Sequence, residues 1–170
     1  MSAGRHPLET LVYPTRDAVH EANREHDLVW WLWRWMIRLW QWLFLDPPAP
    51  PPSDPVLARG HYLVDALGHC GECHTPRDMF GGTQYGAWLS GAPAATGDGT
   101  IPNITPGGDV GGWSEDEIAE YLNSGFTPDF DSAGGEMVSV IKNLANLEPE
   151  DRAAIAAYLK QVPSLPNGHP

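Results

Sequence analysis

The chain has 170 residues and a formal net charge of −12, which allows one domain of ordinary size with an additional segment. The acidity is uneven, because 16 of the 22 acidic residues but only five of the ten Lys and Arg residues follow residue 52. This excess of carboxylates excludes nucleic-acid binding, which needs Lys and Arg to neutralise phosphates. It favours salt-sensitive docking to partners with basic surfaces.

The N-terminal part changes character at residue 28. Residues 1–27 form a polar, charged segment, and residues 28–45 read LVWWLWRWMIRLWQWLFL, with six of the eight tryptophans. We expect a hydrophobic helix over 28–45 that anchors the protein to a membrane. Eighteen helical residues extend about 27 Å, close to the roughly 30 Å of a bilayer core. No small-residue cleavage site follows, so we expect the segment to act as an uncleaved signal-anchor.

Three modes of attachment remain open for this helix. Arg34, Arg38 and Gln41 lie on one narrow stripe at helical spacing. Arginines in the middle of a membrane are costly and should face protein or water, and tryptophan prefers the headgroup region. The helix either spans the membrane, or lies in the interface plane, or docks as an arm on a protein partner.

A proline-rich linker follows at 46–55, with the sequence DPPAPPPSDP. Proline fixes φ and lacks an N–H, so the segment ends the helix and forms a stiff spacer of roughly 30 Å. We expect the globular domain to occupy residues 54–170.

That domain is predicted to be all-α with long loops. Apolar residues at helical spacing predict a helix over 56–67, and the Gly- and Pro-rich stretch 75–112 predicts loop. Ser114 and Glu117 form a capping box for the next helix, which Gly125 ends. The last helix starts at Pro149 and stops before Pro163. Its buried face is expected to consist of Ile155, Tyr158, Leu159 and Val162.

The stretch CGECH places Cys70, Cys73 and His74 in the pattern CxxCH, the attachment motif of c-type haem. Two thiols at this spacing can bond to one porphyrin, with the histidine as proximal iron ligand. One alternative is a thioredoxin-like redox pair, which needs a βαβ setting that is not predicted here. The other is half of a zinc site, for which only scattered histidines are available. A haem would also explain the long loop, which would wrap around it.

A six-coordinate haem needs a second axial ligand, usually Met or His. Met137 is the candidate, because Met79 follows His74 too closely and Met1 and Met36 precede the linker. Glycines 134 and 135 would allow the backbone to approach a porphyrin closely. A distal His61 or His169, or an open sixth position, remains as an alternative.

Residues 54–166 resemble a class I cytochrome c, especially haem domains of proteobacterial dehydrogenase cytochrome subunits and of membrane-anchored cytochromes. The similarity is carried by ARGHYLVDALGHCGECHTPRD, LSGAP, IPNITPGG, GGWSEDEIAEYLNSGF, GGEMVSVIKNL and DRAAIAAYLKQVPSLP. The resemblance implies covalent haem at Cys70 and Cys73 and axial ligation by His74 and Met137. It also implies that the terminal helices cross at Gly60, against Ile155 and Tyr158.

Three further residues have two interpretations each. The carbonyl of Pro76 either accepts from the His74 ring N–H or serves a turn. Asn103 either bonds near the haem or caps a turn. Trp113 either contacts a haem propionate or belongs to the core.

These observations predict a monohaem, membrane-tethered electron-transfer protein that is not itself an enzyme. Haem c is attached outside the cytoplasm, so we expect an inner-membrane protein whose haem domain faces the periplasm, in a respiratory or photosynthetic chain. The expected partners are an integral membrane redox complex (haem–copper oxidase or quinol-oxidising complex) or a periplasmic dehydrogenase. The protein would act as a shuttle or as a fixed subunit. The alternative is a haem enzyme with an open sixth position, acting on peroxide or nitric oxide.

Overall fold

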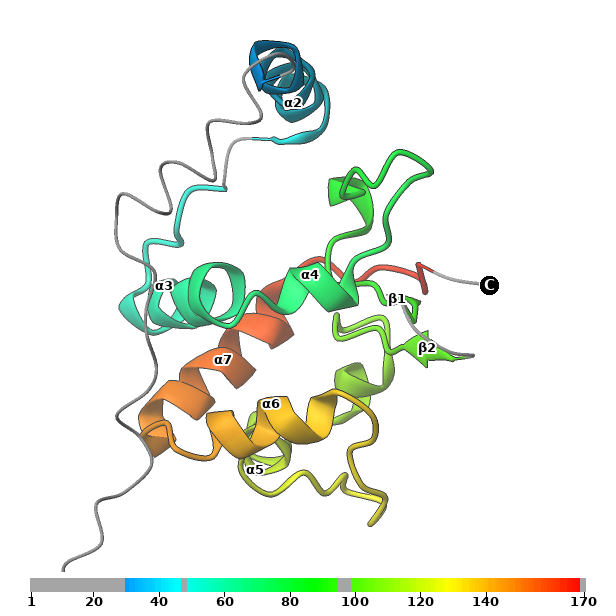
Figure 1. Cartoon of the computed structure of the whole chain (residues 1–170). Helices are drawn as coiled ribbons and strands as arrows, with labels where there is room; N and C mark the ends of the chain where they lie inside the picture. Colours follow the sequence, from blue (N-terminus) through cyan, green and yellow to red (C-terminus); the bar gives the residue numbers. More distant parts are fainter. Residues whose placement is uncertain (1–29, 47–48, 95–98, 169–170) are drawn as a thin grey trace, which may run out of the picture. The chain divides into compact units, whose positions relative to one another are not determined.

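The computed structural model describes residues 30–46, 49–94 and 99–168 (Figure 1), so the predicted polar segment 1–27 lies outside the described residues. The chain divides into two compact units, Met1–Phe44 and Leu45–Pro170.

The described part of the first unit is helix α2 (Trp30–Phe44), which has 15 residues. Positions 28 and 29 of the predicted 28–45 helix are not described. Within the described ranges, no helix is both long enough and apolar enough to cross a membrane. Most of the large side chains of α2 are exposed, up to 79% for Trp42.

The second unit is mostly helical. It begins with α3 (Pro55–His61), whose N-terminal N–H groups at Val56 and Leu57 are capped by the Asp54 carboxylate at 2.9 and 3.0 Å. A π-helical turn (Tyr62–Leu67) continues α3, and the short helix α4 (Cys70–His74) follows. The remaining helices are α5 (Glu115–Ser124), α6 (Met137–Leu144) and α7 (Pro149–Gln161).

The core forms where α3 and the π-helical turn cross α7. Figure 1 shows α7 running between α3 on one side and α5 and α6 on the other. A Cβ added at Gly60 would lie 2.1 Å from the Ala154 carbonyl oxygen and 2.6 Å from Cβ of Tyr158. The predicted crossing at Gly60 is thus confirmed against Tyr158, with Ala154 as the nearest contact. Fully or nearly buried side chains fill the space around it, namely Leu63, Val64, Leu89, Ile118, Leu122, Ile155, Ala156 and Leu159.

The predicted helix over 56–67 is present as α3 and the π-helical turn, but its apolar residues do not share one buried face. Leu63 and Val64 are buried, but Val56 and Leu67 are 54% and 56% exposed. A π-helical turn takes more residues per turn than an α-helix, so positions before and after it no longer share one face. The change of helix type at Tyr62 therefore explains the failure of a uniform helical period.

The predicted ends of the later helices are confirmed. Ser114 and Glu117 form both bonds of the capping box, and Gly125 ends α5 with a φ of 81°. Pro149 lies in the first turn of α7, which ends at Gln161, before Pro163.

The predicted loop 75–112 contains a small element that the sequence did not indicate. Strands β1 (Ala92–Pro93) and β2 (Thr100–Ile101) pair antiparallel, with Ala92 opposite Ile101. Two short 3₁₀ turns, Tyr85–Ala87 and Asp109–Gly112, lie before and after this hairpin. The hairpin is small, but it positions a residue of the functional site.

Candidate haem-binding site

Helix α4 carries all three residues of the CxxCH motif. His69, directly before it, adopts a left-handed backbone conformation with a φ of 51° and thereby starts a new helix direction. Cys70 is partly buried, Cys73 is exposed, and neither forms a disulfide. The two thiols lie nearly one turn apart on one rigid element, as double attachment to a single porphyrin requires.

The ring of His74 is oriented by the β1–β2 hairpin. Its Nδ1 lies 2.8 Å from the carbonyl oxygen of Pro102, the residue after β2. On the main-chain side, the N–H of Gly91 donates to the His74 carbonyl at 2.8 Å. The hairpin thus holds both the backbone and the side chain of this histidine.

This hydrogen bond determines which nitrogen can bind a metal. Burial lowers the pKa of His74, while the bond to Pro102 acts in the opposite direction. A neutral ring whose Nδ1–H donates to a carbonyl has its lone pair on Nε2. Axial ligands of metals are typically oriented in this way through the second ring nitrogen. Of the two interpretations of the Pro76 carbonyl, the bond to His74 is not formed, because His74 Nδ1 pairs with Pro102. The Pro76 oxygen accepts from the Gln84 N–H at 3.0 Å, a contact within the loop.

The two alternatives to haem are not supported by the described residues. Burial, aided by the charge of Asp65, raises the pKa of the Cys70 thiol to about 11, whereas a CxxC redox pair needs a lowered thiol pKa. No cluster of three or more His, Cys, Asp or Glu residues suited to a metal ion occurs in the described ranges. The donor set that remains, two thiols and one oriented imidazole, fits covalent haem c.

Met137 is the first residue of α6 and is partly buried against the core. The preceding glycines leave open space, since a Cβ added at Gly134 or Gly135 meets no heavy atom within 4 Å. Its role as the second axial ligand stays a prediction.

Two histidines, His61 and His169, were the alternatives to Met137 as the second axial ligand. His61 Nε2 faces the Asp65 carboxylate at 3.3 Å, and its ring packs edge-on against Tyr158 at the α3–α7 contact. This engagement within the core argues against a distal role for His61. His169 lies outside the described residues.

Asn103 and Trp113 have structural roles. The Asn103 Oδ1 accepts from the N–H and hydroxyl of Thr105 at 2.9 and 2.8 Å, and its Nδ2 donates to the Leu165 carbonyl at 2.9 Å. Trp113 packs edge-on against Tyr121, with ring centroids 5.4 Å apart. Asn103 thus caps a turn and holds the C-terminal segment after α7, and Trp113 packs against the core.

Several residues of the site escaped sequence reasoning. Pro102 lies 28 residues after His74, and nothing in its local pattern indicates their hydrogen bond. Trp88 packs on α4 so closely that a Cβ at Gly71 would lie 2.1 Å from its ring. Asp65 accepts a hydrogen bond from the Tyr158 hydroxyl at 3.1 Å. These contacts join segments that are distant in the sequence. The sequence shows which residue types are present, but it does not show which of them meet.

An acid-lined hollow of about 530 Å³ lies elsewhere on this unit. Its lining includes four carboxylates, Asp109, Glu117, Asp129 and Asp131, and none of the CxxCH residues or Met137. Four carboxylates would repel an anionic group such as a haem propionate. The hollow is therefore part of the acidic surface and separate from the haem-binding residues.

Comparison with known proteins agrees with this donor set. The cytochrome c family matches residues 57–163. A diheme cytochrome c-type protein of Cereibacter sphaeroides is 50% identical over 161 residues, which cover 93% of this chain and 52% of that protein. The gluconate 2-dehydrogenase cytochrome c subunit of Pantoea cypripedii is 40% identical over 163 residues, covering 85% of this chain and 36% of the relative.

A third relative, the cytochrome c subunit of the quinone alcohol dehydrogenase of Gluconobacter oxydans, is 35% identical over 159 residues, 86% of this chain and 33% of its own length. The chain spans about half to a third of the length of these relatives. With the family match over the helices that carry CxxCH and cross at Gly60, the chain belongs to the cytochrome c family, whose domain carries covalent haem c.

Proposed function

We propose that this protein is a monohaem, membrane-tethered electron carrier, working on the periplasmic side of the inner membrane, that passes single electrons from a dehydrogenase to a membrane redox complex. The observation that carries the proposal is the oriented imidazole of His74 beside two thiols on α4. When bound, the haem supplies a one-electron ferric–ferrous couple.

The chain's own residues define what that couple can do. Cys70 and Cys73 hold the group covalently, so it stays in place in both oxidation states. His74, oriented by Pro102, would bind the haem iron through Nε2, and Met137 would be its second ligand. With both ligands supplied by the protein, the bound haem would exchange single electrons without binding a substrate at the iron.

The proposal of a single haem rests on the motif count. The 170 residues contain two cysteines, both in one CxxCH, which supports one haem on this segment. The relative named as diheme is about twice as long as the segment that matches. A single-haem domain with one electron per cycle suits a relay between partners.

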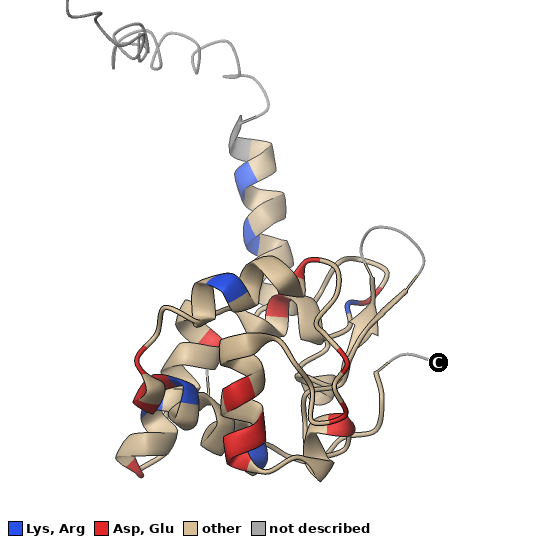
Figure 2. Ribbon diagram, turned by 90° about the horizontal axis from the view of Figure 1, so that it is seen from below, with Lys and Arg blue, Asp and Glu red and all other residues tan. Residues whose placement is uncertain are grey.

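The direction and the partner class rest on the names of the relatives. Two of them are cytochrome c subunits of dehydrogenases for gluconate and alcohol, which supports a dehydrogenase as electron donor. A quinol-oxidising complex is the alternative donor, and the proposed acceptor is a haem–copper oxidase in the same membrane. Figure 2 shows the acidic residues distributed over the second unit, which suits basic docking surfaces and salt-sensitive transfer.

The axial ligation is tested on the haem-loaded full chain. The pyridine haemochrome assay should give one haem per chain, and the ferric spectrum should show the weak far-red band of sulfur-to-iron ligation. Met137→Ala should abolish that band and lower the reduction potential, because Met ligation raises it. Met36→Ala is the matched control, since Met36 lies on α2, and should leave both unchanged.

The competing haem-enzyme function makes the opposite prediction. If the wild-type ferrous protein bound carbon monoxide readily and Met137→Ala changed neither band nor potential, the sixth position would be open and the carrier function would be wrong.

The partner is tested separately. Membranes solubilised mildly and separated on a native gel should show this chain, by haem stain and mass spectrometry, with the subunits of a dehydrogenase. Migration near its own 18.6 kDa plus detergent would indicate a tethered shuttle instead of a fixed subunit.

A further inference from the structure

The side chains of α2 are arranged in lines along the helix axis. At 100° per residue, Leu32, Met36, Leu39 and Leu43 fall within about 60° of one another and form an aliphatic line. These four side chains are 47%, 56%, 51% and 56% exposed. The aliphatic line is therefore not covered by other side chains of α2.

Tryptophans line both flanks of the aliphatic line. Trp33 and Trp40 lie on one side of it and Trp35 and Trp42 on the other, each flank about 70–90° from its centre. Trp33, Trp35 and Trp42 are 58%, 71% and 79% exposed. The polar side chains Arg34, Arg38 and Gln41 share the side opposite the aliphatic line. Figure 2 marks the two arginines in blue, and α2 has no acidic residue.

The placement of tryptophan distinguishes the two ways a helix can meet a bilayer. Tryptophan prefers the headgroup region, so a spanning helix gathers it at its two ends. In α2 the flanking tryptophans run from the first turn to the last. Lines parallel to the axis lie at one depth only when the axis itself lies in the membrane plane.

We propose that α2 lies flat in the headgroup region of an anionic lipid bilayer, with Leu32, Met36, Leu39 and Leu43 deepest and Arg34 and Arg38 toward lipid phosphates. The arginines give α2 a positive charge that complements an anionic leaflet. This inference deepens the tethering part of the proposed function by naming the surface and the orientation.

Vesicle binding tests the surface. The full chain should float with vesicles of phosphatidylcholine and phosphatidylglycerol, and more weakly with phosphatidylcholine alone. Arg38→Gln should weaken binding to the anionic vesicles about fivefold, the amount expected for one basic residue near such a surface, and have little effect on neutral ones. Equal binding to both vesicle types, or no binding, would overturn the proposal.

A matched pair tests which face is deep. Leu39→Glu places a charge on the aliphatic line and should abolish flotation, whereas Gln41→Glu places the same charge on the polar side and should retain binding to neutral vesicles. Equal loss in both variants would overturn the assigned face. An unchanged melting temperature of the haem domain confirms that both variants are folded.

Cysteine labelling tests the flat orientation. Met36→Cys and Arg38→Cys lie near the middle of α2 but on opposite faces, and Cys70 and Cys73 are bonded in haem-loaded protein. With vesicles, a membrane-impermeant maleimide should react at position 38 and not at 36. Protection of both would indicate a spanning helix, and reactivity of both a protein-docked arm; either result overturns the proposal. Electron transfer measured in detergent does not depend on membrane binding. It therefore tests the proposed carrier function separately from the orientation of α2.

Discussion

The two units of this protein treat apolar side chains in opposite ways. In the cytochrome unit, Val64 and Leu89 have no exposed surface, whereas in α2 Trp35 and Trp42 expose 71% and 79% of theirs. Burial of either set of apolar side chains away from water would lower the free energy. What differs is the presence of a second element close enough to cover them. A high apolar content therefore indicates that the side chains of a segment will be buried. The tertiary contacts decide whether they are buried against other parts of the same chain.

In the cytochrome unit, that cover depends on the approach of α3 to α7. We expect Gly60→Val to have the largest effect on stability, because its Cβ would overlap the Ala154 carbonyl oxygen at 2.1 Å. Overpacking at this contact should cost about 3 kcal/mol or more in the free energy of unfolding. Urea denaturation of the haem-loaded protein measures the loss.

Two controls connect this experiment to the comparison of the units. Gly86→Val adds the same side chain where no heavy atom lies within 4 Å, and Trp35→Ala removes a large exposed side chain of α2. Both should change the unfolding free energy of the cytochrome unit by less than about 0.5 kcal/mol. A large loss from Trp35→Ala would show that α2 contributes to the core, and the contrast between the units would not hold.

The next largest loss of stability is expected in the long loop 75–112, which side-chain hydrogen bonds hold in place. Asn103 is buried and joins the Thr105 turn to the Leu165 carbonyl. Asn103→Ala leaves buried polar groups without partners and should cost about 1–3 kcal/mol. Asn123→Ala removes an exposed amide on α5 and is the control, with a cost below about 0.5 kcal/mol. Equal melting temperatures for the two variants would contradict the role assigned to Asn103.

A pH-dependent effect arises at the α3–α7 contact, where polar groups are covered together with apolar ones. Burial raises the pKa of Asp65 above 3.8, against the opposing effects of His61, Tyr158 and Trp88. A carboxyl with a raised folded-state pKa contributes stability that is lost as the pH rises from about 3.8 through its folded value. An asparagine at position 65 does not ionise, so Asp65→Asn does not lose this stability. The unfolding free energy of the variant minus that of wild type should therefore rise between about pH 3.8 and the folded pKa of Asp65, and stay constant at higher pH. A difference that is flat with pH would contradict this.

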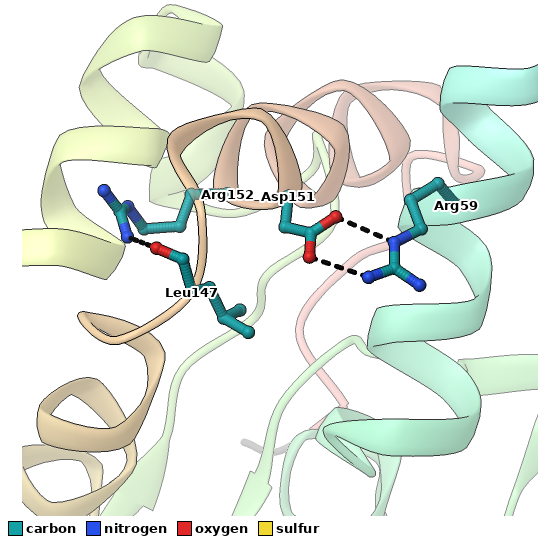
Figure 3. Close-up of polar contacts among 4 residues, drawn as sticks. All are labelled: Arg59, Leu147, Asp151 and Arg152. Carbon is teal, nitrogen blue, oxygen red and sulfur yellow. Dashed lines mark hydrogen bonds and ion pairs between the residues drawn. The ribbon is translucent and has the colours of Figure 1, made fainter.

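The smallest effect is expected on the exposed side of the same contact. Figure 3 shows the Arg59 guanidinium bonded to both oxygens of the Asp151 carboxylate, with two distances of 2.7 Å. The nearby Arg152 guanidinium instead donates to the Leu147 carbonyl. The hydrogen bond from Arg59 lowers the pKa of Asp151 below 3.8. This pair therefore stabilises the fold above that pH, and its contribution is lost as the pH falls through the folded value.

Asp151→Asn should lower the melting temperature slightly at neutral pH. The difference from wild type should shrink in acid and in high salt, because exposed ion pairs are weak and screened. The pH trend is opposite in sign to that of Asp65→Asn, so the two variants check each other. Loss of stability from Asp151→Asn that persisted in 1 M salt would mean that the pair is not an exposed one.

The structure confirms the sequence predictions that depend on neighbouring residues. The capping box of Ser114 and Glu117 and the Gly125 stop are closed within one helix, so the sequence predicts them directly. The motif CGECH places two thiols and an imidazole within five residues, and its chemistry is equally local. Composition likewise shows the acidic character of the second unit and the apolar character of α2.

The tertiary structure decided the features that join distant segments. The ring of His74 is held by Pro102, 28 residues away, through a hairpin of two-residue strands too short to have a periodic signature. The exposure of Val56 and Leu67 follows from a change of helix type at Tyr62. Local patterns report what a residue prefers, but packing between elements decides which side chains meet. For this reason the sequence determined the chemistry of the CxxCH residues, and only the fold determined the orientation of the His74 ring.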